Sequence, residues 1–138
     1  MTAAAGRAVV VYTDGASRGN PGPAGAGWVI EEPGGRVLAA GHAFLGRRTN
    51  NEAEYEAVVR ALAAAQEMGA ADVQLRSDSE LLVRQLNGQY RVRAAGLVPL
   101  HEQVRETARG FARFEARHVP REDNTRADAQ ANAAIDEA

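Results

Sequence analysis

Apolar and polar positions divide the first part of the chain into short strands and turns. Residues 9–12 are a β-branched run that ends at residues 13–15 (TDG), and a glycine and proline cluster follows. Two further apolar stretches, residues 27–31 and 36–44, are separated by the turn sequence EPGG at 32–35. β-Branched residues bounded by glycine and proline are typical of strands, and short turns join antiparallel neighbours. The pattern predicts a three-stranded antiparallel meander.

From residue 51 to about residue 68 the apolar positions change to helical spacing. One stripe of this segment contains Val58, Ala61, Ala65 and Met68. Gly69 follows, and glycine is a common residue just beyond a helix end. The segment is therefore predicted to be the longest helix, with the stripe against a sheet.

The remainder of the chain alternates between strand and helix patterns. Strands are predicted at 73–76 and 111–118, helices at 79–86, 100–109 and 124–134, and residues 89–99 show no clear period. Hairpin-like strands followed by alternating strands and helices predict an α/β fold. We expect a five-stranded mixed sheet, three antiparallel strands and then parallel strands, flanked by three or four helices.

Length and composition are those of one ordinary globular domain. The chain has 138 residues, of which 25% are charged and 45% are apolar, and it contains no cysteine. Disulfides and thiolate metal sites are therefore excluded, and no segment reaches the roughly 20 apolar residues of a membrane helix. We expect a disordered tail at residues 1–7, a single domain at 8–138, a cytoplasmic location and no membrane partner.

The charge balance argues against a strong polyanion partner. The formal net charge is −2, and the sixteen basic residues are all arginine and are dispersed along the chain. Nucleic-acid-binding domains usually carry a basic excess. Binding to a nucleic acid is thus expected to be of modest affinity and sensitive to salt.

Four acidic residues stand where elements begin or end, and each has a structural interpretation. Asp14 precedes a glycine, as a turn-forming aspartate does, and Glu54 lies three residues after Asn51, as the acid of a capping box does. Asp78 and Asp128 stand where helix caps are expected. Taken one at a time, the four acids do not require a functional site.

Taken together, the same four acids predict a metal site. All lie at strand ends or in first helical turns, where α/β sheets gather their sites, and Glu54 also shares the buried stripe of its helix. Clustered carboxylates repel one another unless hard cations neutralise them, and magnesium or manganese fits an all-oxygen set. Two such ions about 4 Å apart can cleave a phosphodiester without a side-chain nucleophile.

Four segments are similar, in order, to the signatures of type 1 ribonucleases H. They are YTDGASRGNPGP (12–23), TNNEAEY (49–55), SDS (77–79) and HVPREDNTRAD (118–128). The resemblance runs from residue 8 to about residue 135, and its strand and helix contexts match. It implies a ribonuclease H-like fold and an endoribonuclease that hydrolyses the RNA strand of RNA–DNA hybrids, leaving 5′-phosphate and 3′-hydroxyl ends.

The resemblance also assigns roles at the site. Asp14 would bridge two Mg²⁺ ions, for which Mn²⁺ could substitute. Asp128 would complete the site of the ion that activates water, and Glu54 and Asp78 would hold the other ion. His118 matches the family's mobile histidine, which is linked to proton movement or product departure, and histidine is suited to proton transfer near neutral pH. No small-molecule cofactor is implied.

Recognition of RNA is assigned to small polar residues and backbone amides. The candidates are Ser17, Gly19, Asn20, Thr49, Asn50, Asn51 and Glu80. They would contact the 2′-hydroxyls of the minor groove or the DNA phosphates, although most of them also suit turns and caps. Glu80 stands where many relatives carry a glutamine, so this part of recognition is expected to differ. Residues 89–99 lack the basic protrusion of some bacterial relatives, which is typical of the short forms of the family.

Three other functions are compatible with parts of the sequence. The first is a catalytically inert hybrid-binding module in which the acids are structural. The second is cleavage of double-stranded RNA as a side activity. The third is a phosphatase of small esters, for which no specific feature is present. We expect a monomer that acts on RNA–DNA hybrids.

Overall fold

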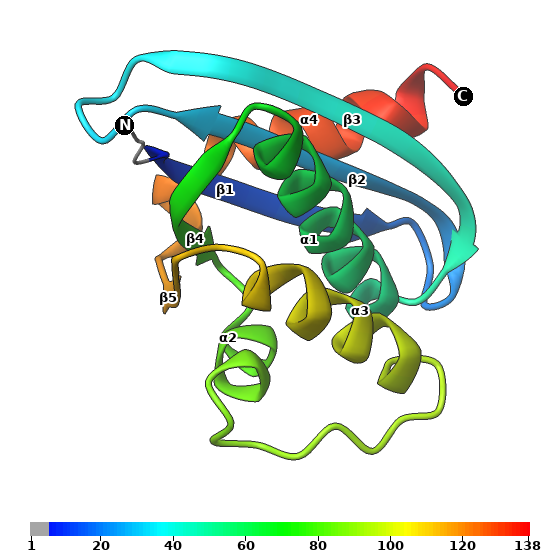
Figure 1. Cartoon of the computed structure of the whole chain (residues 1–138). Coiled ribbons are helices and arrows are strands. Elements are labelled where there is room, and N and C mark those ends of the chain that lie inside the picture. Colours follow the sequence, from blue (N-terminus) through cyan, green and yellow to red (C-terminus); the bar gives the residue numbers. More distant parts are fainter. Residues whose placement is uncertain (1–5) are drawn as a thin grey trace.

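The computed structural model describes residues 6–138 and contains one five-stranded sheet (Figure 1). β1 (Arg7–Ser17), β2 (Gly22–Glu31) and β3 (Val37–Arg48) form an antiparallel meander. β4 (Ala70–Ser77) and β5 (Arg113–His118) continue the sheet as parallel strands beside β1. The order is β3-β2-β1-β4-β5, so the predicted mixed sheet is confirmed.

Helices cover both faces of the sheet. Figure 1 shows α1 (Asn50–Glu67) and α3 (Val98–Arg109) in front of the sheet and α4 (Thr125–Asp136) behind it. α2 (Glu80–Leu86) follows β4, and a short 3₁₀ turn, η1 (Arg121–Asp123), precedes α4. None of the helices in residues 6–138 is long and apolar enough to cross a membrane.

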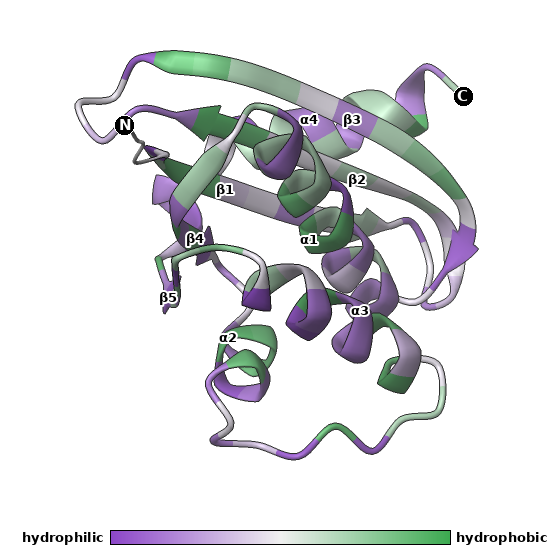
Figure 2. Cartoon of the chain, in the orientation of Figure 1, coloured by the Kyte–Doolittle hydropathy of each residue, from purple (hydrophilic) through white to green (hydrophobic). Residues whose placement is uncertain are grey.

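The main core lies between α1 and the sheet. Val58, Ala61 and Ala65 of the predicted stripe are fully buried there, whereas Met68 is half-buried as the C-cap of α1. Gly69 adopts a positive φ of 76°, as expected of a helix stop. In Figure 2 most of α3 is coloured hydrophilic, and its buried side chain is that of Val104. Most of α3 therefore remains at the surface.

β1 and β2 are longer than the sequence predicts, and only residues 18–21 of the segment that joins them lie outside the two strands. β1 continues through Asp14 to Ser17, and β2 begins at Gly22. A Cβ on Gly27 would lie 2.4 Å from the carbonyl oxygen of Ala127 in α4, so only glycine permits this approach. The interpretation of Asp14 as a turn residue was wrong, since it pairs with Gly27 inside the ladder.

α1 begins one residue earlier than expected and has a different cap. The Thr49 hydroxyl accepts a hydrogen bond from Glu52 N (3.1 Å), and the Glu52 carboxylate accepts one from Thr49 N (2.9 Å). This is a reciprocal capping box. Asn51 is therefore not the N-cap, and Glu54 is not the capping acid. The carboxylate of Glu54 is left available for another role.

The caps of α2 and α4 also differ from those predicted. The Ser79 hydroxyl accepts from Leu82 N (3.3 Å) and caps α2, so Asp78 does not. The start of α4 has no side-chain cap hydrogen bond within the described chain, so Asp128 is not a capping residue. Helix capping thus explains neither Asp78 nor Asp128.

The other boundaries shift by a few residues. α3 begins at Val98, two residues earlier than expected, and β5 begins at Arg113, two residues later. β3 extends to Arg48 and β4 begins at Ala70, so both are longer than predicted. β1 begins at Arg7, inside the expected tail, of which residues 1–5 lie outside the described residues.

Candidate active site

Three acids from three different elements meet at one edge of the sheet. Asp14 comes from β1, Glu54 from the start of α1, and Asp78 from the residue after β4. Their carboxylate oxygens lie within 4.8 Å of one another. β1 and β4 are parallel neighbours paired at Thr13 and Ser77, so the residues that follow this pair are brought side by side.

Asp128 joins the three acids from the opposite side of the sheet. It lies in the first turn of α4 and lines the same hollow as the other three acids. The acids line an open hollow of about 340 Å³. The hollow is lined by Asp14, Gly15, Ala16, Ser17, Asn50, Asn51, Glu54, Asp78, Arg121, Asp128 and Asn132. The structure therefore brings all four predicted acids to one place.

The position of Glu54 is set by the backbone of β1. Gly15 N donates a hydrogen bond of 2.6 Å to the Glu54 carboxylate. A Cβ on residue 15 would lie 2.2 Å from the carbonyl carbon of Ala53, so α1 can approach β1 this closely only at glycine. The Asp-Gly sequence thus contributes one carboxylate and anchors a second.

The electrostatics of the cluster are unfavourable without a counterion. Burial raises the pKa of Asp14, and the neighbouring carboxylates of Glu54, Asp78 and Asp128 raise it further. Burial also raises the pKa of Glu54, against the opposing hydrogen bond from Gly15 N. Protonation or a bound cation would relieve this repulsion.

The donor set fits hard divalent cations. Asp14, Glu54 and Asp78 offer carboxylate oxygens at mutual distances that one ion can span, and Asp128 adds a fourth carboxylate beside Asp14. Among residues 6–138, neither a histidine nor a cysteine lines this hollow, which favours magnesium or manganese over zinc.

Comparison with known proteins identifies the family. A family model described as reverse transcriptase-like matches residues 12–134. Ribonuclease HI of Halobacterium salinarum is 47% identical over 133 residues, which cover 96% of this chain and 67% of that protein. The chain belongs to the type 1 ribonuclease H family.

Solved structures of ribonucleases H have the same fold. The crystal structure of the Halobacterium salinarum enzyme superimposes with a TM-score of 0.92 at 47% identity and covers 94% of this chain and 98% of that one. LC11-RNase H1, solved in complex with an RNA/DNA hybrid, gives a TM-score of 0.90 at 42% identity over 94% of this chain and 97% of that one.

A bifunctional protein of Mycobacterium tuberculosis is 42% identical over 94% of this chain, which spans only 36% of that protein's length. This chain therefore matches a part of the mycobacterial protein.

Some of the predicted substrate contacts of this ribonuclease H line the acidic hollow and others do not. Ser17, Asn50 and Asn51 line it. The Ser17 hydroxyl donates to the carbonyl oxygens of Arg48 (2.8 Å) and Gly19. Asn20 lies in the turn after β1, and its side-chain oxygen accepts from Asn50 N (3.0 Å). Thr49 is occupied as the N-cap of α1.

Glu80 and His118 lie outside the lining of the hollow. Glu80 is exposed at the start of α2 and accepts hydrogen bonds from the Arg84 guanidinium at 2.8 and 3.0 Å. His118 is exposed at the end of β5, where it pairs with Ser77, the residue before Asp78. His118 therefore lies at the same end of the sheet as the acids, but it does not line their hollow.

Two residues of the hollow with polar side chains were not singled out from the sequence. Arg121, in η1, is the one cationic residue among those that line the hollow. Asn132 donates from its amide to the carbonyl oxygen (3.0 Å) and the carboxylate (3.4 Å) of Asp128. The spacing of Asn132 four residues after Asp128 on one helix could have indicated this contact. Arg121 lies within the fourth signature, three residues after His118.

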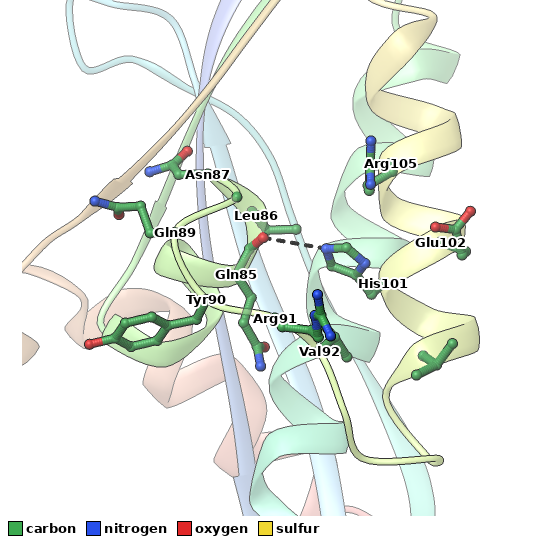
Figure 3. Close-up of a pocket in the computed structure, with 12 residues that line it drawn as sticks. Gln85, Leu86, Asn87, Gln89, Tyr90, Arg91, Val92, His101, Glu102 and Arg105 are labelled. Carbon is green, nitrogen blue, oxygen red and sulfur yellow. Dashed lines mark hydrogen bonds between the residues drawn. The ribbon is translucent and has the colours of Figure 1, made fainter.

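A second, larger hollow lies away from the acids. It has a volume of about 760 Å³ and lies between the end of α2, residues 87–92 and α3 (Figure 3). His101 reaches from α3 to the carbonyl oxygen of Gln85 (3.4 Å), and Arg91 and Arg105 lie around it. Glu102 is the one acid in its lining, so this hollow lacks the clustered carboxylates of a hard-cation site.

Proposed function

We propose that this ribonuclease H hydrolyses the RNA strand of RNA–DNA hybrids by internal cleavage, leaving 5′-phosphate and 3′-hydroxyl ends. The observation that carries the proposal is the convergence of Asp14, Glu54 and Asp78 within 4.8 Å, with Asp128 beside Asp14. The relative LC11-RNase H1, which covers nearly the same length, was solved with an RNA/DNA hybrid. This supports the hybrid as the substrate.

The four carboxylates would hold two Mg²⁺ ions, with Mn²⁺ as a substitute. When bound, the two cations supply activation of a water molecule and stabilisation of the charge on the leaving 3′-oxygen. Asp14 is the common neighbour of the other three acids, each of which raises its pKa. In keeping with the family resemblance, Asp14 would be the residue that helps to hold both ions.

Side chains around the acids would bind and orient the RNA strand. Ser17, Asn50 and Asn51 present hydroxyl and amide groups at the hollow, and such groups suit a 2′-hydroxyl that both donates and accepts. The guanidinium of Arg121 would hold a phosphate of the same strand. His118, exposed at the end of β5, would carry a proton as the product leaves.

Glu80 distinguishes this chain from relatives with a glutamine at the matching position. Its carboxylate cannot donate a hydrogen bond to a base or to a 2′-hydroxyl, and it is paired with Arg84. We assign Glu80 to holding Arg84 at the surface beside the site. Contact with the RNA would then come from the residues that line the hollow.

The test is cleavage of an end-labelled RNA–DNA hybrid with magnesium, with and without a chelator. Single- and double-stranded RNA of the same sequence are the substrate controls. Asp14→Asn removes the shared carboxylate, and Arg36→Ala, in the turn at the far end of β2, is the matched control variant. We expect metal-dependent cutting of the RNA strand, lost in Asp14→Asn and retained in Arg36→Ala.

Binding of the hybrid without cutting by the parent protein would instead support an inert hybrid-binding module. Equal cutting of double-stranded RNA would contradict the preference for hybrids.

A further inference from the structure

Asn124 occupies the point where the elements that carry the acids meet. Its side chain is 1% exposed. The amide nitrogen donates to the carbonyl oxygen of Thr13 (2.8 Å) and to the carboxylate of Asp78 (3.3 Å). The backbone carbonyl oxygen of Asn124 accepts a hydrogen bond from Asp128 N (3.1 Å), which is the first backbone hydrogen bond of α4. One residue thus contacts the strand before Asp14, the carboxylate of Asp78 and the backbone of Asp128.

The orientation of the Asn124 amide is determined by its partners. Thr13 O and the Asp78 carboxylate are both acceptors, so the NH₂ group must face them. The side-chain oxygen is then buried without a hydrogen-bond partner among residues 6–138. A buried acceptor with no partner destabilises a fold. Stability alone therefore does not account for an asparagine at this position.

Direct contact with a substrate does not account for Asn124 either. At 1% exposure the side chain is covered by protein, and it does not line the acidic hollow. Among the four acids, the Asn124 side chain contacts Asp78, and its neutral amide NH₂ group donates to one carboxylate oxygen. A cationic partner in the same place would neutralise that carboxylate and compete with a metal ion, whereas an amide leaves its charge intact.

We infer that Asn124 is a positioning residue for the metal site, holding one oxygen of Asp78 so that the other is directed to a cation. This inference rests on the proposed function, because it requires Asp78 to be a metal ligand. The bond to Thr13 O extends the same constraint to β1, directly before Asp14. Outer partners of this kind orient metal ligands, and their loss typically weakens metal binding about 10- to 100-fold.

Two variants separate positioning from stability. Asn124→Ala removes the donor to Asp78. Asn124→Ser also places a good N-cap residue at the start of α4, where the structure shows no side-chain cap bond. Tyr55→Phe is the matched control, because it deletes another buried hydrogen bond, from the Tyr55 hydroxyl to the Gln85 side chain in α2 (2.6 Å), in which none of the four acids takes part.

The first measurement is calorimetric titration with Mn²⁺ in the absence of nucleic acid, with melting temperatures recorded in chelator. We expect Asn124→Ala to bind Mn²⁺ about 10- to 100-fold more weakly than the parent chain. Asn124→Ser is expected to melt higher than Asn124→Ala and still to bind Mn²⁺ more weakly than the parent. Tyr55→Phe is expected to melt lower with unchanged Mn²⁺ affinity.

Kinetics with the hybrid give the second measurement. At limiting Mn²⁺, kcat of Asn124→Ala should fall while KM for the hybrid stays the same, and higher Mn²⁺ should restore part of the rate.

Parent-like Mn²⁺ affinity in both Asn124 variants would overturn the inference, and if Asn124→Ala fails to fold, Asn124→Ser alone decides it. A parent chain that binds Mn²⁺ but leaves the hybrid uncut would refute the proposed function and not the positioning role. A parent chain that does not bind Mn²⁺ would refute both.

Discussion

At the scale of single residues, Asp14 combines burial with repulsion from the other carboxylates of the site. It is 5% exposed and has the carboxylates of Glu54, Asp78 and Asp128 around it. Its pKa is raised above the ordinary value first by burial and then by these neighbours. A metal-binding site of this kind lowers the stability of the metal-free fold, which cation binding then recovers.

Asp14→Asn is expected to stabilise the metal-free protein while abolishing hydrolysis. Because the folded-state pKa of Asp14 is raised, its contribution to the stability of the metal-free parent is complete below its unfolded pKa and is lost as pH rises through the folded pKa. Relief of about 1–2 kcal/mol corresponds to a rise of about 3–6 °C in Tm for a chain of this size. Thermal melts in chelator at about pH 6 and about pH 9 would measure both effects. A lower Tm for the variant at the higher pH would contradict this account.

At the scale of elements, two glycines of β2 allow α4 to lie directly on the sheet. Ala24 and Ala26 belong to a buried cluster with residues of α1, whereas Gly25 and Gly27 meet the backbone of α4 on the opposite face. Gly27 is also the β2 partner of Asp14 and contacts Ala127, the residue before Asp128. The approach of α4 to β2 thus sets the separation of Asp14 and Asp128.

Gly27→Ala is expected to destabilise the fold by about 3 kcal/mol. The added Cβ would lie 2.4 Å from the backbone of both Ala127 and Ala131, and backbone atoms cannot yield as a flexible side chain can. Urea unfolding measures the loss. Gly34→Ala, where no atom lies within 4 Å of the new Cβ, is the matched control and should be nearly neutral. Similar midpoints for the two variants would refute the close contact.

His42 ties β3 to α4 in a way that depends on pH. Its two ring nitrogens lie 2.7 Å from the Gln130 side-chain oxygen and 3.1 Å from the Glu137 carboxylate. The hydrogen bond to Gln130 and the neighbouring Glu137 raise the pKa of His42, although partial burial opposes them. Both acceptors are satisfied together only when the imidazole is protonated.

His42→Ala should therefore cost more stability in acid than in base. A raised folded-state pKa means that the contribution is complete below the unfolded pKa of His42 and is lost as pH rises through the folded value. Unfolding free energies of parent and variant at about pH 5.5 and about pH 8.5 would give this difference. A gap that is constant with pH would show that His42 acts by packing alone.

At the scale of the whole molecule, a net charge of −2 means that the chain carries no basic excess to attract a polyanionic substrate. Arg121 stands at the acidic hollow, and Arg91 and Arg105 lie beside the second hollow. Each phosphate contact made by such a residue releases counterions and steepens the dependence of affinity on salt. Binding of the hybrid should thus be modest in affinity and dominated by a few arginines.

Arg121→Ala, in the Asp14→Asn background, should weaken binding of the hybrid to a similar degree for every sequence. The slope of log affinity against log salt should become shallower by about 0.9, the contribution of one phosphate contact. Fluorescence anisotropy over a range of salt concentrations would measure it, with Arg36→Ala as the control. An unchanged slope would mean that Arg121 does not contact a phosphate.

Part of the fold could be predicted from the sequence because its signals are local. β-Branched runs, the stripe of Val58, Ala61 and Ala65, and the stop at Gly69 depend on neighbours within one element, and the structure agrees with them. The predicted capping residues were wrong because several hydroxyl and carboxylate groups compete for the free backbone N–H groups at each helix start. Thr49 and Glu52 satisfy each other, which the spacing from Asn51 to Glu54 could not reveal.

The family, the mixed sheet and the candidate carboxylates of a metal site can be predicted from the amino-acid sequence, because motif order and periodicity are properties of the linear chain. The contacts that hold the site together are visible only in the folded protein. Asn124 contacts Thr13 across 111 positions, and the glycines of β2 are selected by the backbone of α4. Such contacts depend on the distance between elements. Burial and packing set that distance, and no local sequence pattern predicts it.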